Sequence, residues 1–220
     1  MSGKEKVFLL HGIALNRYSL IYLQNRLQKS GFDATALSYP STTLPLDALA
    51  DWFYTTYLEP TDLNSYGKIH FIGHSMGGLV IRETLAKYKD RIDPDKVGRV
   101  VMLGSPNQGS ELADAFKDFR LYKWFFGPAG QELTTHHRKT RLYPCYYEVG
   151  ILAGTVKWLY PLSCIWIKGD HDGRVSVDST KLPDMKDHIS LKTSHTFMIY
   201  RRDVSRQIIS FIKTGSFERG

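Results

Sequence analysis

Short apolar runs alternate with stretches of helical periodicity along most of this chain, and this alternation is the strongest constraint on its fold. The run KVFLL at residues 6–10 is apolar enough for a buried strand. Leu20, Leu23 and Leu27 then recur at the spacing of one helix face. Strands that alternate with helices form a mostly parallel sheet covered on both faces. The expected fold class is therefore α/β, with a mostly parallel sheet and helices on both of its faces.

The same alternation continues to the carboxyl terminus. β-branched residues mark the expected strands, and apolar side chains at intervals of three and four mark the expected helices. We expect further strands at residues 32–40, 68–74, 96–105 and 162–170. We expect helices at residues 46–57 and 75–88, and along an apolar stripe formed by Phe197, Tyr200, Val204, Ile208 and Phe211.

The stretch from Gln108 to Leu162 interrupts this pattern. It is rich in phenylalanine, tyrosine and tryptophan, contains FGPAG at residues 126–130, and has no clear strand period. Any one of its aromatic side chains would ordinarily belong to the core, but their number favours a lid or an apolar pocket. We expect a single domain over residues 1–220, in which residues 108–162 form an insertion of short helices and loops over the carboxyl edge of the sheet.

Length, cysteine content and hydrophobicity narrow the class of protein. The chain has 220 residues, of which 42% are apolar, enough for one well-buried core. Its two cysteines, Cys145 and Cys164, lack the paired spacing of a zinc site and are expected to be free thiols. The chain contains no unbroken run of about 18 apolar residues, which a helix would need to span a bilayer. The amino terminus does not resemble a signal peptide, so a cytoplasmic location is expected.

The net charge of +7 leaves several partners open. It is compatible with nucleic acid, anionic lipid or an acidic substrate, but no nucleic-acid motif accompanies it. A solvated basic surface is the simpler interpretation, with no nucleic-acid partner and with contact to anionic lipid as an open alternative. The basic stretch HHRKTR at residues 136–141 is the densest group of these charges, and a solvated loop is favoured there over an anion site.

A serine between two glycines stands where a strand is expected to meet a helix. Gly73, Ser75 and Gly77 form the pattern G-x-S-x-G, which is weak evidence alone. At a junction of strand and helix, however, a tight turn of this kind lifts the serine hydroxyl out at the end of a sheet. The following helix, which begins at Met76, directs unpaired backbone N–H groups towards the same place and so favours negative charge there.

A serine hydroxyl is a weak nucleophile unless a base removes its proton, so a histidine and a group that orients it should also be present. His195 lies in the loop before the last expected helix, and Asp170 and Asp172 follow the expected strand at 162–170. The carboxyl ends of strands in α/β sheets are where such chemistry collects. Either aspartate could orient the histidine. The chain order is serine, acid, histidine.

Several of these motifs together resemble a known family. HG after the first strand, GHSMGGLV, LGSPNQGS, DGRVS and SHTFM are similar to the motifs of a small bacterial lipase or esterase of the α/β-hydrolase superfamily. The resemblance implies the α/β-hydrolase fold and an acyl-ester hydrolase that needs no cofactor. It also implies that the acid is Asp172, which precedes G-x-V, rather than Asp170. The catalytic residues would then be Ser75, Asp172 and His195.

The resemblance also implies an oxyanion hole, which binds the negative oxygen of an acyl-transfer intermediate. Its two N–H donors would come from Met76, the residue after the nucleophile, and from Ile13 in the loop HGIALN, although Ala14 could take the place of Ile13. His11 and His74 are expected to have structural roles. His171, together with His195 and two aspartates, offers side chains of the kinds that bind metals. Their spacing in the sequence matches no metal site, so no metal is predicted.

The predicted partner is a small-molecule acyl ester or a lipid, cleaved through an acyl-enzyme intermediate on Ser75. Two other classes of function use the same features. An acyltransferase, thioesterase or amidase would use the same three side chains, and a non-catalytic ligand-binding protein could keep the fold. A protein that binds lipid or nucleic-acid surfaces through its basic charge is a third alternative.

Overall fold

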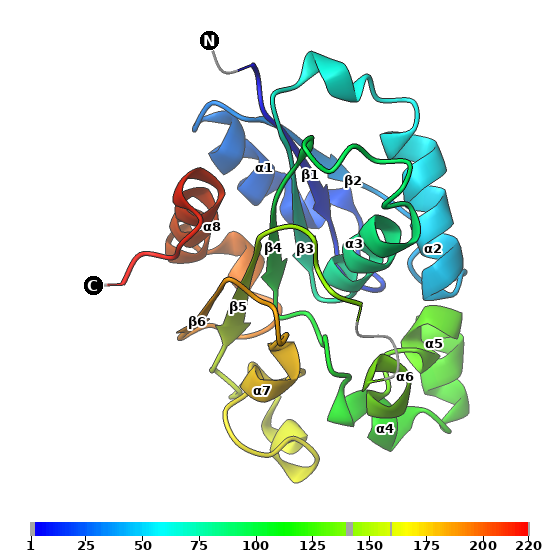
Figure 1. Cartoon of the computed structure of the whole chain (residues 1–220). Helices are drawn as coiled ribbons and strands as arrows, with labels where there is room; N and C mark the ends of the chain where they lie inside the picture. Colours follow the sequence, from blue (N-terminus) through cyan, green and yellow to red (C-terminus); the bar gives the residue numbers. More distant parts are fainter. Residues whose placement is uncertain (1–2, 140–142, 159, 220) are drawn as a thin grey trace.

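A six-stranded parallel sheet forms the centre of the molecule (Figure 1). The computed structural model describes residues 3–139, 143–158 and 160–219. The strands lie in the order β2-β1-β3-β4-β5-β6, and every neighbouring pair is parallel, which confirms the expected α/β class. The strands are β1 (Lys6–Leu10), β2 (Asp33–Leu37), β3 (Ile69–His74), β4 (Val97–Leu103), β5 (Val149–Gly154) and β6 (Asp187–Leu191).

Helices cover both faces of this sheet. On one face, α1 (Ile21–Gln28) and α8 (Arg202–Thr214) pack on a core that includes Val7 and Leu9 of β1. On the other face, α2 (Leu46–Phe53) and α3 (Met76–Lys87) pack on a core that includes Phe8 and Leu10 of β1. Successive side chains of a strand point to opposite faces, so a continuously apolar strand supplies both cores at once. Figure 1 shows α1 and α8 on one side of the sheet and α2 and α3 on the other.

One strand lies inside the stretch expected to be an insertion. β5 occupies residues 149–154, so the expectation that residues 108–162 contain only helices and loops is wrong over this segment. Its sequence VGILAG includes two glycines, which lower strand propensity and hide the pattern. Gly150 is required by packing, because a Cβ there would come within 2.8 Å of the ring of Phe211 on α8.

The strand expected at residues 162–170 is also wrong. Residues Pro161–Ile165 form a 3₁₀ helix, and a loop follows. Ile165 is 68% exposed, so the apolar run that suggested a buried strand does not enter the sheet. The sixth strand is instead β6, which carries Asp187, His188 and Ser190 because it lies at the edge of the sheet and is only partly buried.

The carboxyl-terminal helix is shorter than its apolar stripe indicated. α8 begins at Arg202, and Val204, Ile208 and Phe211 are buried as expected. Phe197 and Tyr200 precede the helix, and both are about half exposed. Tyr200 belongs to a separate 3₁₀ helix, Met198–Tyr200, which ends where the backbone becomes extended.

The first part of the interrupting stretch is largely helical. It contains α4 (Glu111–Phe116), α5 (Arg120–Gln131) and α6 (Thr135–Lys139), and α5 is kinked where Gly127 precedes Pro128. The basic stretch 136–141 is not a solvated loop over its described part, because α6 buries Arg138 completely against Glu83 of α3. Residues 140–142 lie outside the described part of the chain. A short helix α7 (Val177–Thr180) follows later. Within the described ranges, no helix combines the length and the hydrophobicity needed to cross a bilayer.

Candidate active site

Ser75 occupies a sharp turn between β3 and α3. Its backbone has φ +54° and ψ −124°, a conformation that non-glycine residues rarely adopt. The turn is possible only because its neighbours are glycines: a Cβ at Gly73 would fall 2.3 Å from Gly78, and one at Gly77 would fall 2.4 Å from the carbonyl oxygen of Leu10. The sequence at 73–78 thus encodes a strained strand-to-helix turn that presents the Ser75 side chain at the end of the sheet.

Asp172 and His195 meet in a buried hydrogen bond. The distance from Asp172 Oδ2 to His195 Nδ1 is 2.7 Å, and both residues are at most 3% exposed. The other carboxylate oxygen, Oδ1, accepts hydrogen bonds from the backbone N–H groups of Arg174 and Val175, each at 2.9 Å. The backbone N–H of His195 donates to the carbonyl oxygen of Asp172 at 2.9 Å. The two loops are therefore held together by backbone and side chain alike.

Contacts at the end of β4 bring this pair to the same edge of the sheet as Ser75. The N–H of Ser75 donates to the carbonyl oxygen of Leu103 at 2.8 Å. The next residue, Gly104, faces the pair closely: a Cβ there would lie 2.9 Å from Asp172 Oδ2 and 3.2 Å from His195 Nδ1. No hydrogen bond joins Ser75 to the His195 ring among the described residues, so the contact from histidine to acid is formed and the contact from serine to histidine is not. Such contacts often tighten only when substrate binds.

The loop after β1 borders Ser75 on its other side. A Cβ at Gly12 would lie 3.1 Å from Ser75 Cβ, so the next peptide N–H, that of Ile13, belongs to the same small region. The Ala14 N–H is already used, because it donates to Ser41 Oγ at 3.1 Å. Within the described chain, the N–H groups of Ile13 and Met76 have no acceptor. Of the two donors considered for this loop, Ile13 is the one that remains available.

Asp170 and His171 do not join the pair. The Asp170 side chain is exposed, whereas Asp172, two residues later, faces inward. His171 is buried, and its Nδ1 accepts a hydrogen bond from the Gly173 N–H at 3.1 Å. Its Nε2 lies 3.6 Å from Cys164 Sγ. The part of the chain that the structure describes contains no group of three or more histidine, cysteine, aspartate or glutamate side chains that could hold a metal ion.

His11 and His74 serve the structure of this edge. His11 stacks on Tyr39, with 4.3 Å between ring centroids, and the Tyr39 hydroxyl donates to the His11 carbonyl oxygen at 2.6 Å. His74 Nε2 lies 3.0 Å from the carbonyl oxygen of His195 and so supports the loop that carries it. Burial lowers the pKa of His11 and lowers the pKa of His74 well below its ordinary range, so both rings are neutral at pH 7.

Ser41 is a site residue that sequence reasoning missed. It follows β2 at the carboxyl edge of the sheet, is buried, and holds the Ala14 N–H. Ala14 itself has φ +57°, so this loop is strained and its conformation depends on such contacts. The only signal in the sequence was its position, directly after a predicted strand at the edge where Ser75 was expected.

Comparison with known proteins gives one family. A model described as alpha/beta hydrolase fold matches residues 6–138, more than half of the chain. The mature lipase BlEst2 of Bacillus licheniformis superposes with a TM-score of 0.77 at 19% identity, covering 90% of this chain and 87% of that one. A metagenomic carboxyl esterase, MGS0156, superposes with a TM-score of 0.70 at 18% identity, covering 89% and 65%.

A thioesterase shares the fold as well. YbtT, a type II thioesterase from the Yersiniabactin biosynthetic pathway, superposes with a TM-score of 0.64 at 13% identity, covering 96% of this chain and 94% of that one. At such identities these likenesses show a common fold. The activities of these three proteins therefore remain statements about those proteins.

Proposed function

Because this chain belongs to the α/β-hydrolase fold family, we propose that it is a serine hydrolase that cleaves carboxylic esters. In this proposal Ser75 is the nucleophile, His195 the general base and Asp172 the residue that orients the base. The observation that carries this proposal is the buried 2.7 Å hydrogen bond between Asp172 and His195. It lies at the same edge of the sheet as the strained turn of Ser75. That a lipase and a carboxyl esterase share the fold supports an ester as substrate.

In this proposal each step of the reaction has a named atom. His195 Nε2 removes the Ser75 proton while Oγ attacks the ester carbonyl carbon. Asp172 fixes the tautomer of His195 that carries its proton on Nδ1, and it stabilises the imidazolium that forms. The imidazolium then protonates the leaving alkoxide, which departs as an alcohol and leaves an acyl-enzyme. Water attacks this acyl group with His195 again as base, and the free acid leaves.

Negative charge on the carbonyl oxygen would be stabilised by backbone donors. The N–H groups of Ile13 and Met76 both lack acceptors within the described residues and flank Ser75. The positive end of α3 adds to this field because α3 begins at Met76. Each donor at such a site contributes on the order of 3 kcal/mol to transition-state stabilisation.

A thioesterase or an acyltransferase is the second candidate, and the thioesterase among the similar structures favours the first of these. A thioesterase or acyltransferase would form the same acyl-enzyme on Ser75 and differ only in the donor or in the acceptor. Product analysis with an alcohol present beside water separates transfer from hydrolysis, because a transferase forms new ester in preference to free acid. A cytoplasmic location stays a prediction.

The experiment that tests the proposal is covalent labelling with a fluorophosphonate, mapped by peptide, beside turnover of p-nitrophenyl esters. Label is expected on Ser75. Ser75→Ala should lose the label, and its turnover should fall by roughly 10⁴- to 10⁶-fold. Ser105→Ala is the matched control, since Ser105 is another buried serine just beyond the end of β4. Label on a different serine, or ester turnover that survives Ser75→Ala, would reject Ser75 as the nucleophile. Wild type with neither label nor turnover would leave a binding protein as the alternative.

A further inference from the structure

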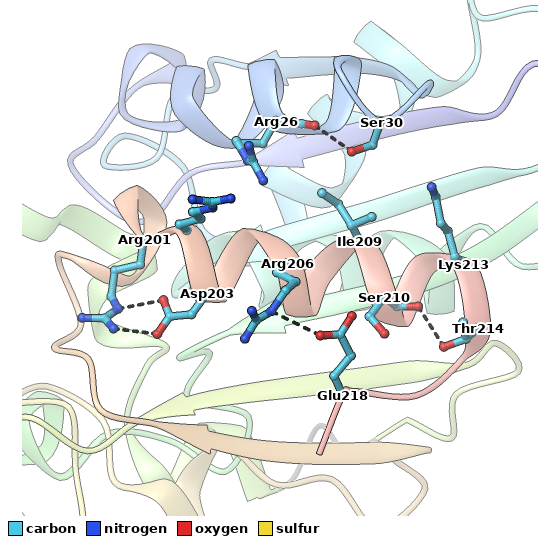
Figure 2. A pocket seen from close by; sticks show the side chains of 11 residues that line it. Arg26, Ser30, Arg201, Asp203, Arg206, Ile209, Ser210, Lys213, Thr214 and Glu218 are labelled. Carbon is cyan, nitrogen blue, oxygen red and sulfur yellow. Dashed lines mark hydrogen bonds and ion pairs between the residues drawn. The ribbon is translucent and has the colours of Figure 1, made fainter. Parts of the chain in front are cut away.

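A basic groove separates α1 from α8 on the face of the sheet that these helices cover (Figure 2). It encloses about 790 Å³. Arg26 of α1 and Arg202 and Lys213 of α8 line it. The Arg26 side chain donates to the Ser205 hydroxyl at 3.3 Å, and Lys213 lies over the Phe32 ring at 6.0 Å. Within the described residues, none of the three cations has an acidic partner.

The two acidic side chains in the groove are already neutralised. Asp203 pairs with Arg201 at 2.6 Å, and Glu218 pairs with Arg206 at 3.2 Å, as Figure 2 shows. Within each pair the positive and the negative charge cancel. The groove therefore keeps a net charge of about +3 from the unpaired cations, which are spread over α1 and α8 rather than gathered at one point.

Exposed apolar side chains lie at one end of this groove. They belong to the 3₁₀ helix Arg17–Leu20, to the start of α1, and to the 3₁₀ helix Met198–Tyr200 with the residue before it, and these three elements contact one another. The chain continues from the last of them directly into Arg201 and Arg202. The exposed side chains are Tyr18 at 65%, Ile21 at 45%, Phe197 at 49% and Tyr200 at 47%.

We propose that this face, the groove with its apolar end, binds the surface of an anionic lipid bilayer. Aromatic and aliphatic tips beside arginines are the composition of an interfacial anchor, with the rings at headgroup depth and the cations on phosphates. Arg202 and Lys213 stand about 16 Å apart along α8, so a single phosphate does not reach both whereas a surface of phosphates does. Ile21 favours lipid over single-stranded nucleic acid, because an aliphatic side chain offers no stacking platform.

The position of this face connects it to the site. Phe197 is two residues after His195, so the apolar end adjoins the edge of the sheet that carries the proposed triad. A bilayer bound there would bring ester-bearing lipid to that edge. This consequence for substrate rests on the proposed function, whereas the binding itself does not.

The test is co-sedimentation of the full chain with vesicles of phosphatidylcholine, with or without phosphatidylglycerol. Wild type should bind only the anionic vesicles and should be released by salt. Removing the three unpaired cations should lower the partition coefficient about fivefold for each, or roughly a hundredfold together. The variant is Arg26→Gln, Arg202→Gln and Lys213→Gln. A second variant, Tyr18→Ser with Tyr200→Ser, should also weaken binding while leaving its salt dependence.

A matched control removes the same charge from the opposite edge of the sheet. Lys68 precedes β3, and Lys89 and Arg91 follow α3, so all three lie at the amino edge and are exposed. Lys68→Gln, Lys89→Gln and Arg91→Gln together should leave vesicle binding within about twofold of wild type. Equal losses in both triple variants would show that overall charge alone binds the vesicles, and would overturn the proposal.

Further outcomes separate this proposal from the proposed function. Ser75→Ala should bind anionic vesicles like wild type, whatever its turnover. The groove triple variant should keep wild-type turnover of a water-soluble ester, so loss of vesicle binding and loss of catalysis are read independently. Equal binding to neutral vesicles, or binding to a single-stranded polynucleotide that excludes the vesicles, would overturn the assignment of the groove to anionic lipid.

Discussion

The protein buries two acid–base pairs of nearly equal length in different surroundings. Asp172 and His195 lie 2.7 Å apart at the carboxyl edge of the sheet, and Glu83 and Arg138 lie 2.9 Å apart between α3 and α6. In the first pair, two backbone N–H groups stabilise the second carboxylate oxygen. In the second pair, Arg138 Nε and Nη2 are buried without an acceptor among the described residues.

This difference separates a pair that orients from a pair that anchors. The carboxylate of Asp172 is held by fixed dipoles in its own loop, so its charge is stabilised before any reaction begins. The Arg138 guanidinium bears the cost of desolvation with only part of its hydrogen-bonding capacity used. Arg138 serves to hold segments in place, because its ion pair with Glu83 ties the helical stretch 111–139 to α3, the helix that follows Ser75.

Breaking the first pair should have the largest effect. Asp172→Asn preserves shape, but an amide can donate to Nδ1 and so favours the wrong tautomer of His195. We expect kcat for a p-nitrophenyl ester to fall by about 10⁴ with little change in thermal stability. Asp170→Asn is the matched control, because its side chain is exposed two residues away, and it should stay within about threefold of wild type. Similar losses in both variants would contradict the assignment of the acid.

Breaking the second pair should instead lower stability. Arg138→Met leaves the Glu83 carboxylate buried alone, and we expect the free energy of unfolding in urea to fall by about 3 to 5 kcal/mol. Replacing both partners, as Arg138→Met with Glu83→Met, should recover most of this loss, because no unpaired charge is then buried. A double variant as unstable as the single one would mean that the pair itself, rather than its broken half, stabilises the fold.

His70 gives a third case, a buried base that is neutral at pH 7. Burial, together with Arg99 and Lys68 nearby, lowers the pKa of His70 to about 4 from an ordinary 6.5. The unfolded chain therefore binds a proton at a higher pH than the folded chain does. The contribution of the neutral His70 ring to the free energy of unfolding is complete above pH 6.5 and is lost as the pH falls towards 4. The loss is at most about 3 kcal/mol, since the half-exposed Glu5 carboxylate 3.6 Å from Nε2 opposes it.

The comparison variant is His70→Asn, whose amide oxygen can replace Nδ1 as acceptor for the Arg99 N–H. Its free energy of unfolding should depend less steeply on pH between 6.5 and 4 than that of wild type. Urea unfolding at several pH values measures both slopes. Parallel slopes in the two proteins would show that other buried histidines, such as His74, account for the acid sensitivity.

Sequence patterns predicted the strands and helices that have strong local signals. β1 to β4 and α1 to α3 follow from apolar runs and helical spacing, and the G-x-S-x-G pattern predicted the turn at Ser75. The side chains of Asp172 and His195 lie together as the motif order predicted, while their catalytic role remains a proposal.

The missed features depend on tertiary contacts that no local pattern encodes. β5 was missed because Gly150 is there to admit Phe211, some 60 residues later, at the expense of strand propensity. Arg138 was assigned to a solvated loop because charge density in a sequence does not reveal a buried partner such as Glu83. Ser41 was missed because it acts through the backbone of Ala14, a loop contact without a motif.

That contact leads to the smallest effect we expect. Ser41→Ala removes the acceptor of the Ala14 N–H, at a residue whose φ of +57° needs support. A neutral hydrogen bond of this kind is worth about 1 kcal/mol, so the loop that carries the Ile13 N–H should hold its position less well. We expect kcat to fall about fivefold with KM nearly unchanged, because a donor to the oxyanion acts in the transition state. Ser38→Ala is the control, since Ser38 Oγ accepts an exposed backbone N–H from Arg17. A rise in KM at constant kcat would place Ser41 in ground-state binding instead.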